Sequence, residues 1–103
     1  MIMAVIHLNK DNFEEITREG LALVDFWATW CGPCRMQAPV VDQLDTELGA
    51  SVKVCKVDVD AEPALARKFR VMSIPTLIAL KDGQIKETRV GYQDLQSLKD
   101  MLK

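Results

Sequence analysis

Apolar positions along this chain alternate between two spacings, one typical of buried strands and the other of amphipathic helices. Apolar or alternating runs predict strands at residues 3–7, 21–27, 52–59, 76–80 and 85–90. Helical spacing predicts helices at residues 9–18, 34–48, 63–69 and 94–102. The last two strands are joined by a turn at 81–83 and should form an antiparallel hairpin. The predicted order is therefore β-α-β-α-β-α-β-β-α.

Residues with special backbone preferences mark several ends of these elements. Asn9 is a suitable N-cap for the first helix, and Gly20 and Gly49 are suitable stops after the first and second helices. Pro39 lies inside the second helix and should kink it, because proline removes one backbone hydrogen bond. The predicted inward face of that helix consists of Val40, Val41, Leu44 and Leu48.

Strands that alternate with helices imply parallel pairing through right-handed crossovers. We therefore predict an α/β fold, with a mixed β-sheet that is parallel apart from its C-terminal antiparallel hairpin and helices on both faces. The 103 residues are expected to form a single domain, 1–103, with one buried core.

Composition and charge exclude several classes of partner. Hydrophobic residues make up 49% of the chain, charged residues 27%, and the net charge is −2, so neither nucleic acid nor an anionic membrane is an expected partner. No apolar stretch approaches the ~20 residues of a membrane span, and the N-terminus lacks the basic region of a signal peptide. We expect a monomer that works in the cytoplasm or an equivalent reducing compartment.

The most informative chemistry is the pair Cys31 and Cys34, which are separated by Gly32 and Pro33 and lie between a buried apolar run and a helix. Residues three apart in the first turn of a helix share a face, so these thiols can close a disulfide if their Cα atoms approach to about 5.5 Å. Pro33 suits this place, because its φ is already helical and its missing N–H would have no partner there. A dithiol in this position predicts a redox site.

Three other uses of the pair are less well supported. A structural zinc site needs four ligands, and the other candidates, Cys55 and His7, are isolated from each other and from the pair. An iron–sulfur cluster would need thiolates from a second chain. A purely structural disulfide stabilises least when it closes so short a loop.

Asp25 is the charged residue within the apolar run at 21–27. A carboxylate in apolar surroundings is costly to ionise, so its pKa should be raised. Asp25 is therefore a candidate to relay the proton that leaves Cys34. The alternative is an acid at a strand end that simply contacts water.

The chain resembles the thioredoxin family over essentially its full length. The residues that carry the resemblance are Asp25-Phe26-Trp27-Ala28-Thr29-Trp30-Cys31-Gly32-Pro33-Cys34, Pro39, Lys56, Ile74-Pro75-Thr76 and Gly91. The Trp-Cys-Gly-Pro-Cys sequence is highly specific, because oxidising or isomerising relatives usually carry another dipeptide between the cysteines. The resemblance implies a thioredoxin fold and reduction of protein disulfides.

In the chemistry that this resemblance implies, Cys31 is the exposed attacking thiol, since the N–H groups and dipole at a helix start favour its thiolate. Cys34, shielded one turn further in, would then attack the mixed disulfide and release the reduced client. Asp25 would be the family's buried acid, and Lys56 the lysine near it, with its stem along the core.

The resemblance also implies a surface that binds the client. Ile74-Pro75 is expected to be a cis bond facing the dithiol, with the backbone of Ile74 pairing to an extended client. Trp30 is expected to form part of this platform, although a tryptophan that fills a local groove is the alternative. The other residues of the expected binding set are Gly32, Pro33 and Gly91.

No cofactor is expected to be bound, because no Gly-rich dinucleotide fingerprint is present. Electrons would come indirectly from a thioredoxin reductase that uses NADPH and FAD, or from a ferredoxin-linked reductase, and would pass to client proteins that contain disulfides. The rival hypothesis is a binding module whose thiols have no role. An intact dithiol together with Asp25 and Pro75 argues against it.

Three other residues have plainer interpretations. Cys55 lies among valines and is expected to be a small buried hydrophobe, and His7 is expected to be solvated. Met72 should contribute to the rim that faces the client. It and Ser73 depart from the small or basic residues expected there, which affects client preference.

Overall fold

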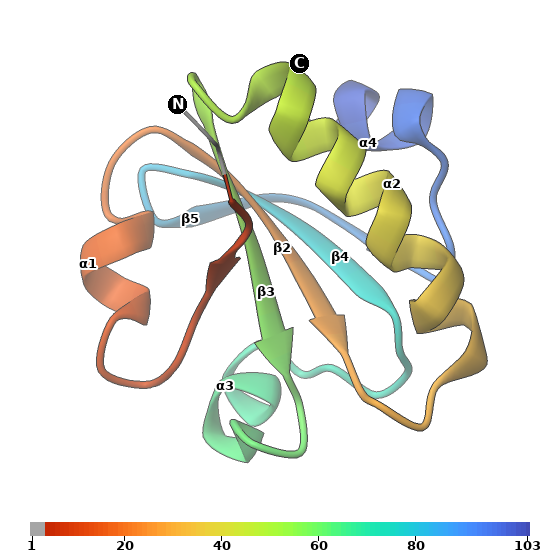
Figure 1. Cartoon of the computed structure of the whole chain (residues 1–103). Helices are drawn as coiled ribbons and strands as arrows, with labels where there is room; N and C mark the ends of the chain where they lie inside the picture. The colour runs from red at the N-terminus through yellow and green to blue at the C-terminus, as the bar shows by residue number, and fades with distance from the viewer. Residues whose placement is uncertain (1–3) are drawn as a thin grey trace.

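The structure is a computed structural model that describes residues 4–103. The order of elements confirms the predicted β-α-β-α-β-α-β-β-α arrangement (Figure 1). The elements are β1 (Ile6–His7), α1 (Phe13–Thr17), β2 (Leu21–Trp27), α2 (Gly32–Leu48), β3 (Val52–Asp58), α3 (Pro63–Lys68), β4 (Thr76–Lys81), β5 (Gln84–Val90) and α4 (Leu95–Met101).

The strands form one mixed sheet in the order β1-β3-β2-β4-β5. β1, β3 and β2 run parallel, whereas β4 is antiparallel to both β2 and β5. β2 lies at the centre and is buried on both faces, which explains why its sequence is an almost continuous apolar run. The predicted mixed sheet is therefore confirmed.

Two apolar layers separate the sheet from its helices. On one face the sheet packs against Phe13 of α1 and Leu65 of α3. On the other face it packs against residues of α2 and α4, including Leu44 and Leu98. Helices thus cover both faces, as the alternating sequence pattern predicts. Among residues 4–103, no helix is long and apolar enough to cross a bilayer.

The N-terminal region differs in detail from the prediction. The first helix begins at Phe13 rather than after Asn9. Asn9 still acts like a cap for the turn before the helix, because its Oδ1 accepts hydrogen bonds from the backbone N–H groups of Asp11 (2.8 Å) and Asn12 (2.9 Å). Residue 3, where the first strand was expected to begin, lies outside the described residues.

The last hairpin turns through Asp82 and Gly83, both of which have positive φ, at 51° and 80°. This is the backbone conformation of a two-residue hairpin turn that matches the twist of the strands it joins. Asp82 also fixes the segment between α1 and β2, because its Oδ1 accepts a hydrogen bond from the N–H of Gly20 at 2.7 Å. The predicted turn at 81–83 is confirmed.

Candidate active site

The Cys31–Cys34 disulfide lies where the chain leaves β2 and enters α2. Cys31 is the N-cap of α2, and Pro33 occupies its first turn, as predicted. The two Cα atoms are 5.2 Å apart. The Sγ of Cys31 also accepts a hydrogen bond from the backbone N–H of Cys34 at 3.2 Å. The start of this helix therefore both closes the disulfide and directs an N–H group at the Cys31 sulfur.

The expectation that Cys31 is exposed is wrong for this disulfide form. Cys31 and Cys34 are 5% and 4% exposed, so exposure does not separate the two residues. The physical reason is that both pack in one small apolar cluster with Ala28, against which Trp27 and Ile74 also pack. Any difference in reactivity between the two cysteines must therefore come from the electrostatic environment of each sulfur and from the groups that surround it.

Asp25 is buried beneath the site, with 1% of its surface exposed. Within residues 4–103, neither of its carboxylate oxygens has a hydrogen-bond partner. Burial raises the pKa of Asp25 from 3.8 to about 7, and the nearby charge of Lys56 partly opposes this rise. The predicted rise in pKa is confirmed, and the alternative of an acid that contacts water at a strand end is excluded.

Lys56 lies near both the buried acid and the inner cysteine. It is the register partner of Asp25 across β3 and β2, so both side chains lie on the same face of the sheet. Its Nζ lies 5.1 Å from the ring centroid of Trp27. A cavity of about 120 Å³ is lined by Lys56 together with Cys34 and Ala38. The lysine thus lies close enough to Asp25 to act on its charge, and it shares a cavity with the inner cysteine.

The outer side of the disulfide faces the segment that precedes β4. The Ile74–Pro75 peptide bond is cis, as the family resemblance implied. The carbonyl oxygen of Ile74 lies 3.7 Å from the Sγ of Cys31. The carbonyl oxygen of Pro75 accepts a hydrogen bond from the N–H of Gly91 at 2.8 Å, which ties this segment to the end of β5.

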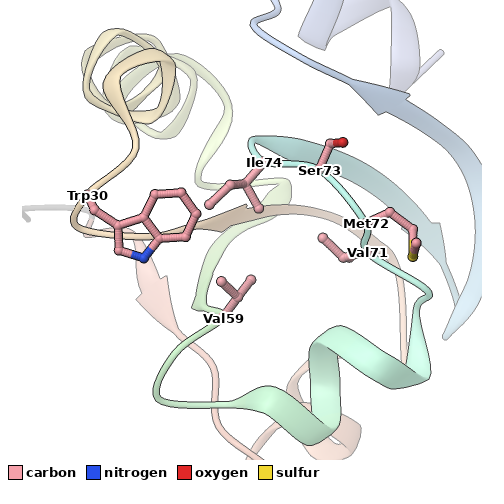
Figure 2. Close-up of a pocket in the computed structure, with 6 residues that line it drawn as sticks. All are labelled: Trp30, Val59, Val71, Met72, Ser73 and Ile74. Atoms are coloured by element: carbon pink, nitrogen blue, oxygen red, sulfur yellow. The ribbon is translucent and has the colours of Figure 1, made fainter.

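An apolar groove of about 420 Å³ runs beside this segment. Figure 2 shows the indole of Trp30 extending over the groove toward Ile74, with Val71 and Met72 on the far side. Trp30 is 66% exposed, so it does not fill a groove of its own, and its Nε1 donates to Asp60 Oδ2 at 2.8 Å. Met72 is 92% exposed at the rim.

Sequence reasoning missed Gln37, whose side chain is completely buried. Its Nε2 donates to the carbonyl oxygen of Gln93 at 2.9 Å, and its Oε1 accepts from the N–H of Gln93 at 2.7 Å. A signal was available, because Gln37 follows Cys34 by three residues and precedes Val41 by four. That spacing places it on the inward stripe of α2.

The ligands considered for a zinc site do not join the disulfide. Cys55 is fully buried in the core between the sheet and α1 and α3, and burial raises the pKa of its thiol to about 12. This confirms the interpretation of Cys55 as a buried hydrophobe. His7 is exposed at the end of β1, on an edge strand. Among residues 4–103, no three His, Cys, Asp or Glu side chains form a group that could hold a metal ion.

A disulfide between the N-cap and first turn of a helix, above a buried acid and beside an apolar groove, defines a dithiol–disulfide oxidoreductase. The thioredoxin family model matches residues 4–103. The chain is 47% identical over 100 residues to thioredoxin of Bacillus subtilis (strain 168), which covers 97% of this chain and 96% of that one. It is 51% identical over 98 residues to thioredoxin of Listeria monocytogenes, with 95% of each chain covered.

A solved structure agrees with these sequence comparisons. The crystal structure of thioredoxin (Mala s 13) from Malassezia sympodialis matches with a TM-score of 0.86 at 35% identity, covering 98% of this chain and 90% of that chain. The chain belongs to the thioredoxin family. It is a dithiol–disulfide oxidoreductase with protein-disulfide reductase activity, and its electrons pass from a thioredoxin reductase to protein disulfides.

Proposed function

We propose that Cys31 attacks the client disulfide and that Cys34 resolves the mixed disulfide. The observation that carries this assignment is the N–H of Cys34, which points at the Sγ of Cys31 at the start of a 17-residue helix. An N–H donor and the positive end of the helix both stabilise negative charge on that sulfur. The same sulfur lies next to Ile74, beside the groove where a client would bind.

The exchange balances in two steps. The Cys31 thiolate forms a bond to one client sulfur, and the client S–S bond breaks to release the other sulfur as a thiolate. Cys34, once deprotonated, attacks the Sγ of Cys31, which forms the intramolecular disulfide and releases the second client thiolate. Two electrons pass to the client, and each released thiolate takes up a proton.

Asp25 is proposed to accept the proton of Cys34. A carboxyl whose pKa is about 7 is a useful base near neutral pH, because it is partly ionised and still holds a proton well. Lys56 is proposed to assist from the small cavity that it shares with Cys34, where its ammonium group favours the ionised carboxylate.

The client is proposed to bind in an extended form across the backbone of Ile74, with an apolar side chain in the groove beside Trp30. The groove is lined almost entirely by apolar side chains, and Met72 at its rim is free to adapt to different clients. The further binding residues in this proposal are Gly32, Pro33, Pro75 and Gly91.

We also propose that residues 1–103 act as a monomeric single domain in the cytoplasm, where the pair is kept reduced. Recharging would come from a reductase that uses NADPH and FAD, or from a ferredoxin-linked enzyme, with no cofactor on this chain. The net charge of −2 supports protein clients rather than nucleic acid or membrane.

Trapping tests these roles. With dithiothreitol as electron donor, Cys34→Ser should accumulate a mixed disulfide with insulin, whereas Cys31→Ser should lose insulin reduction. Cys55→Ser is the matched control and should behave as the unmodified protein, because its thiol is buried and protonated. Turnover by Cys31→Ser would show that the roles are assigned wrongly. Biological activity in a Cys31→Ser, Cys34→Ser protein would favour the binding module.

A further inference from the structure

Gln37 is a buried amide one helical turn after Cys34. Its N–H and C=O groups both bond to the backbone of Gln93, in the segment between β5 and α4. The neighbouring inward positions of α2 are occupied by Val41 and Leu44. Their side chains are fully buried like that of Gln37, but they are apolar. A buried amide is tolerated only when it is hydrogen-bonded, so this clamp determines how the segment at Gln93 lies against α2.

The hydrogen bonds continue from Gln93 to the segment opposite the disulfide. The Nε2 of Gln93 donates to the carbonyl oxygen of Gly91 at 3.2 Å, and the N–H of Gly91 donates to the carbonyl oxygen of Pro75 at 2.8 Å. Ile74 precedes Pro75 and places its carbonyl oxygen 3.7 Å from the Sγ of Cys31. The chain of contacts therefore begins on the helix that carries the dithiol and ends beside it.

The side chain of Gln93 is also held from α4 and β5. Its Oε1 accepts a hydrogen bond from the Oγ of Ser97 at 2.6 Å, and that Oγ accepts from Nη1 of Arg89 at 2.7 Å. Both ends of the Gln93 amide are thus engaged, which restricts its rotation. A side chain held in this way can transmit a displacement of α2 to Gly91.

We propose that Gln37 is a positioning residue that holds the client-binding backbone of Ile74 in register with the dithiol. This inference rests on the proposed binding of clients along Ile74. The proposed role of Gln37 predicts different effects on two kinds of substrate. A protein client needs that backbone edge, whereas a small aromatic disulfide needs only access to the sulfur of Cys31.

The test compares Gln37→Met with Gln43→Met. Methionine keeps the length and approximate volume of glutamine but cannot clamp a backbone N–H and C=O. Gln43 lies on the same helix, is exposed, and bonds only to Glu47 in the described part of the chain. The measurements are kcat and KM for insulin reduction, the rate with a small aromatic disulfide, and amide hydrogen exchange at Gly91 relative to Val24 in the core of β2.

Gln37→Met removes both hydrogen bonds that hold Gln93 against α2, so it should raise the KM for insulin several-fold while the small-disulfide rate stays unchanged. Hydrogen exchange at Gly91, measured relative to exchange at Val24, should be faster in Gln37→Met than in the unmodified protein. Gln43→Met should change none of these values. The proposal is overturned if Gln37→Met matches Gln43→Met in KM and in Gly91 exchange. It is equally overturned if insulin and small-disulfide reduction fall together.

Two further variants keep the result decisive. Ile74→Asp places a charge in the apolar groove that the client is proposed to fill. If it leaves the KM for insulin unchanged, the proposed client site is wrong. A raised KM together with no effect of Gln37→Met contradicts the positioning role alone. If Gln37→Met does not fold, Gln93→Ala removes the bond to Gly91 and keeps the backbone partners of Gln37. It should speed exchange at Gly91 and raise the KM for insulin, and no change in either would overturn the proposal.

Discussion

The two faces of the central sheet differ in how they treat buried polar groups. The face under α1 and α3 is built from Ala22, Val24, Phe26, Cys55, Val57, Ile78 and Leu80. Buried polar residues on this side include Thr17 and Thr76, whose hydroxyls donate to backbone carbonyls three or four residues away. These groups are satisfied locally and link no distant parts of the chain.

The face under α2 and α4 carries Asp25 and Lys56, and α2 contributes the buried Gln37. The carboxyl of Asp25 has no hydrogen-bond partner within residues 4–103, and Gln37 bonds to a residue far along the chain. This face therefore holds groups that local satisfaction does not explain. Both faces carry an apolar core, but only the face under α2 and α4 also holds a buried acid without hydrogen-bond partners in the described residues, at a cost in stability.

The largest expected effect uses two leucines of β4 that point to opposite faces. Leu77→Ala and Leu80→Ala should each lower the free energy of unfolding by about 2–5 kcal/mol, because both side chains are fully buried. Leu77 is the register partner of Asp25, so its loss should also admit water beside the carboxyl and lower the pKa of Asp25. Unfolding measured from pH 4 to pH 8 should show a changed pH dependence for Leu77→Ala alone. The same change in Leu80→Ala would contradict the division between the faces.

Asp25→Asn should remove the pH dependence that this face introduces. The folded pKa of Asp25, about 7, exceeds its ordinary 3.8, so between these values the folded protein holds a proton that the unfolded chain has lost. Stability from this group is therefore lost as the pH rises through that window, and the loss reaches about 4 kcal/mol above it. At pH 8 we expect Asp25→Asn to be more stable by about 1–3 kcal/mol, since its amide is also buried without partners.

The same variant should resolve mixed disulfides more slowly, which stopped-flow measurement of client release would detect. A variant less stable than the unmodified protein at pH 8 would contradict burial of an ionising acid. The internal control is pH 3, below the ordinary pKa of 3.8, where both the folded and the unfolded chain hold the proton. The gain in stability from Asp25→Asn should disappear there.

Lys56→Met should act on the same acid with a smaller effect. Lys56 lowers the pKa of Asp25, so its removal should raise that pKa further and make the folded protein less stable at pH 8. Titration of the Asp25 carboxyl carbon by NMR measures this directly. Lys53→Met is the matched control, because Lys53 lies on the same strand and bonds to the carbonyl oxygen of Glu19. Equal pKa values in the two variants would show that Lys56 does not act on Asp25.

The smallest expected effect concerns Arg70, which follows α3 and has a φ of 55°. A non-glycine residue in this left-handed conformation is strained, so Arg70→Gly should stabilise the fold by about 0.5–1 kcal/mol without changing its pH dependence. Arg67→Gly inside α3 should have the opposite sign, because glycine weakens a helix interior. Thermal unfolding measures the change in stability of both variants. A loss of stability in Arg70→Gly would show that the backbone at Arg70 is not strained.

Several parts of the site could be predicted from sequence because they depend on near neighbours. The placement of Cys31, Gly32, Pro33 and Cys34 follows from the preferences of a helix start. The raised pKa of Asp25 follows from the apolar run that surrounds it. The clamp at Gln37 could not be predicted in this way, because its partner Gln93 lies 56 residues later and has no matching local pattern.

The sequence by itself determined the order of strands and helices, the redox pair and the buried acid, because hydrophobic spacing, helix capping and the cost of ionisation act over a few residues. Only the tertiary structure decided that β4 lies beside β2, so that Ile74 faces Cys31, and that Lys56 lies level with Asp25. It also covered the Cys31 sulfur that the helix start alone would leave exposed. These contacts join distant segments, and their geometry is fixed when the layers pack around the whole sheet.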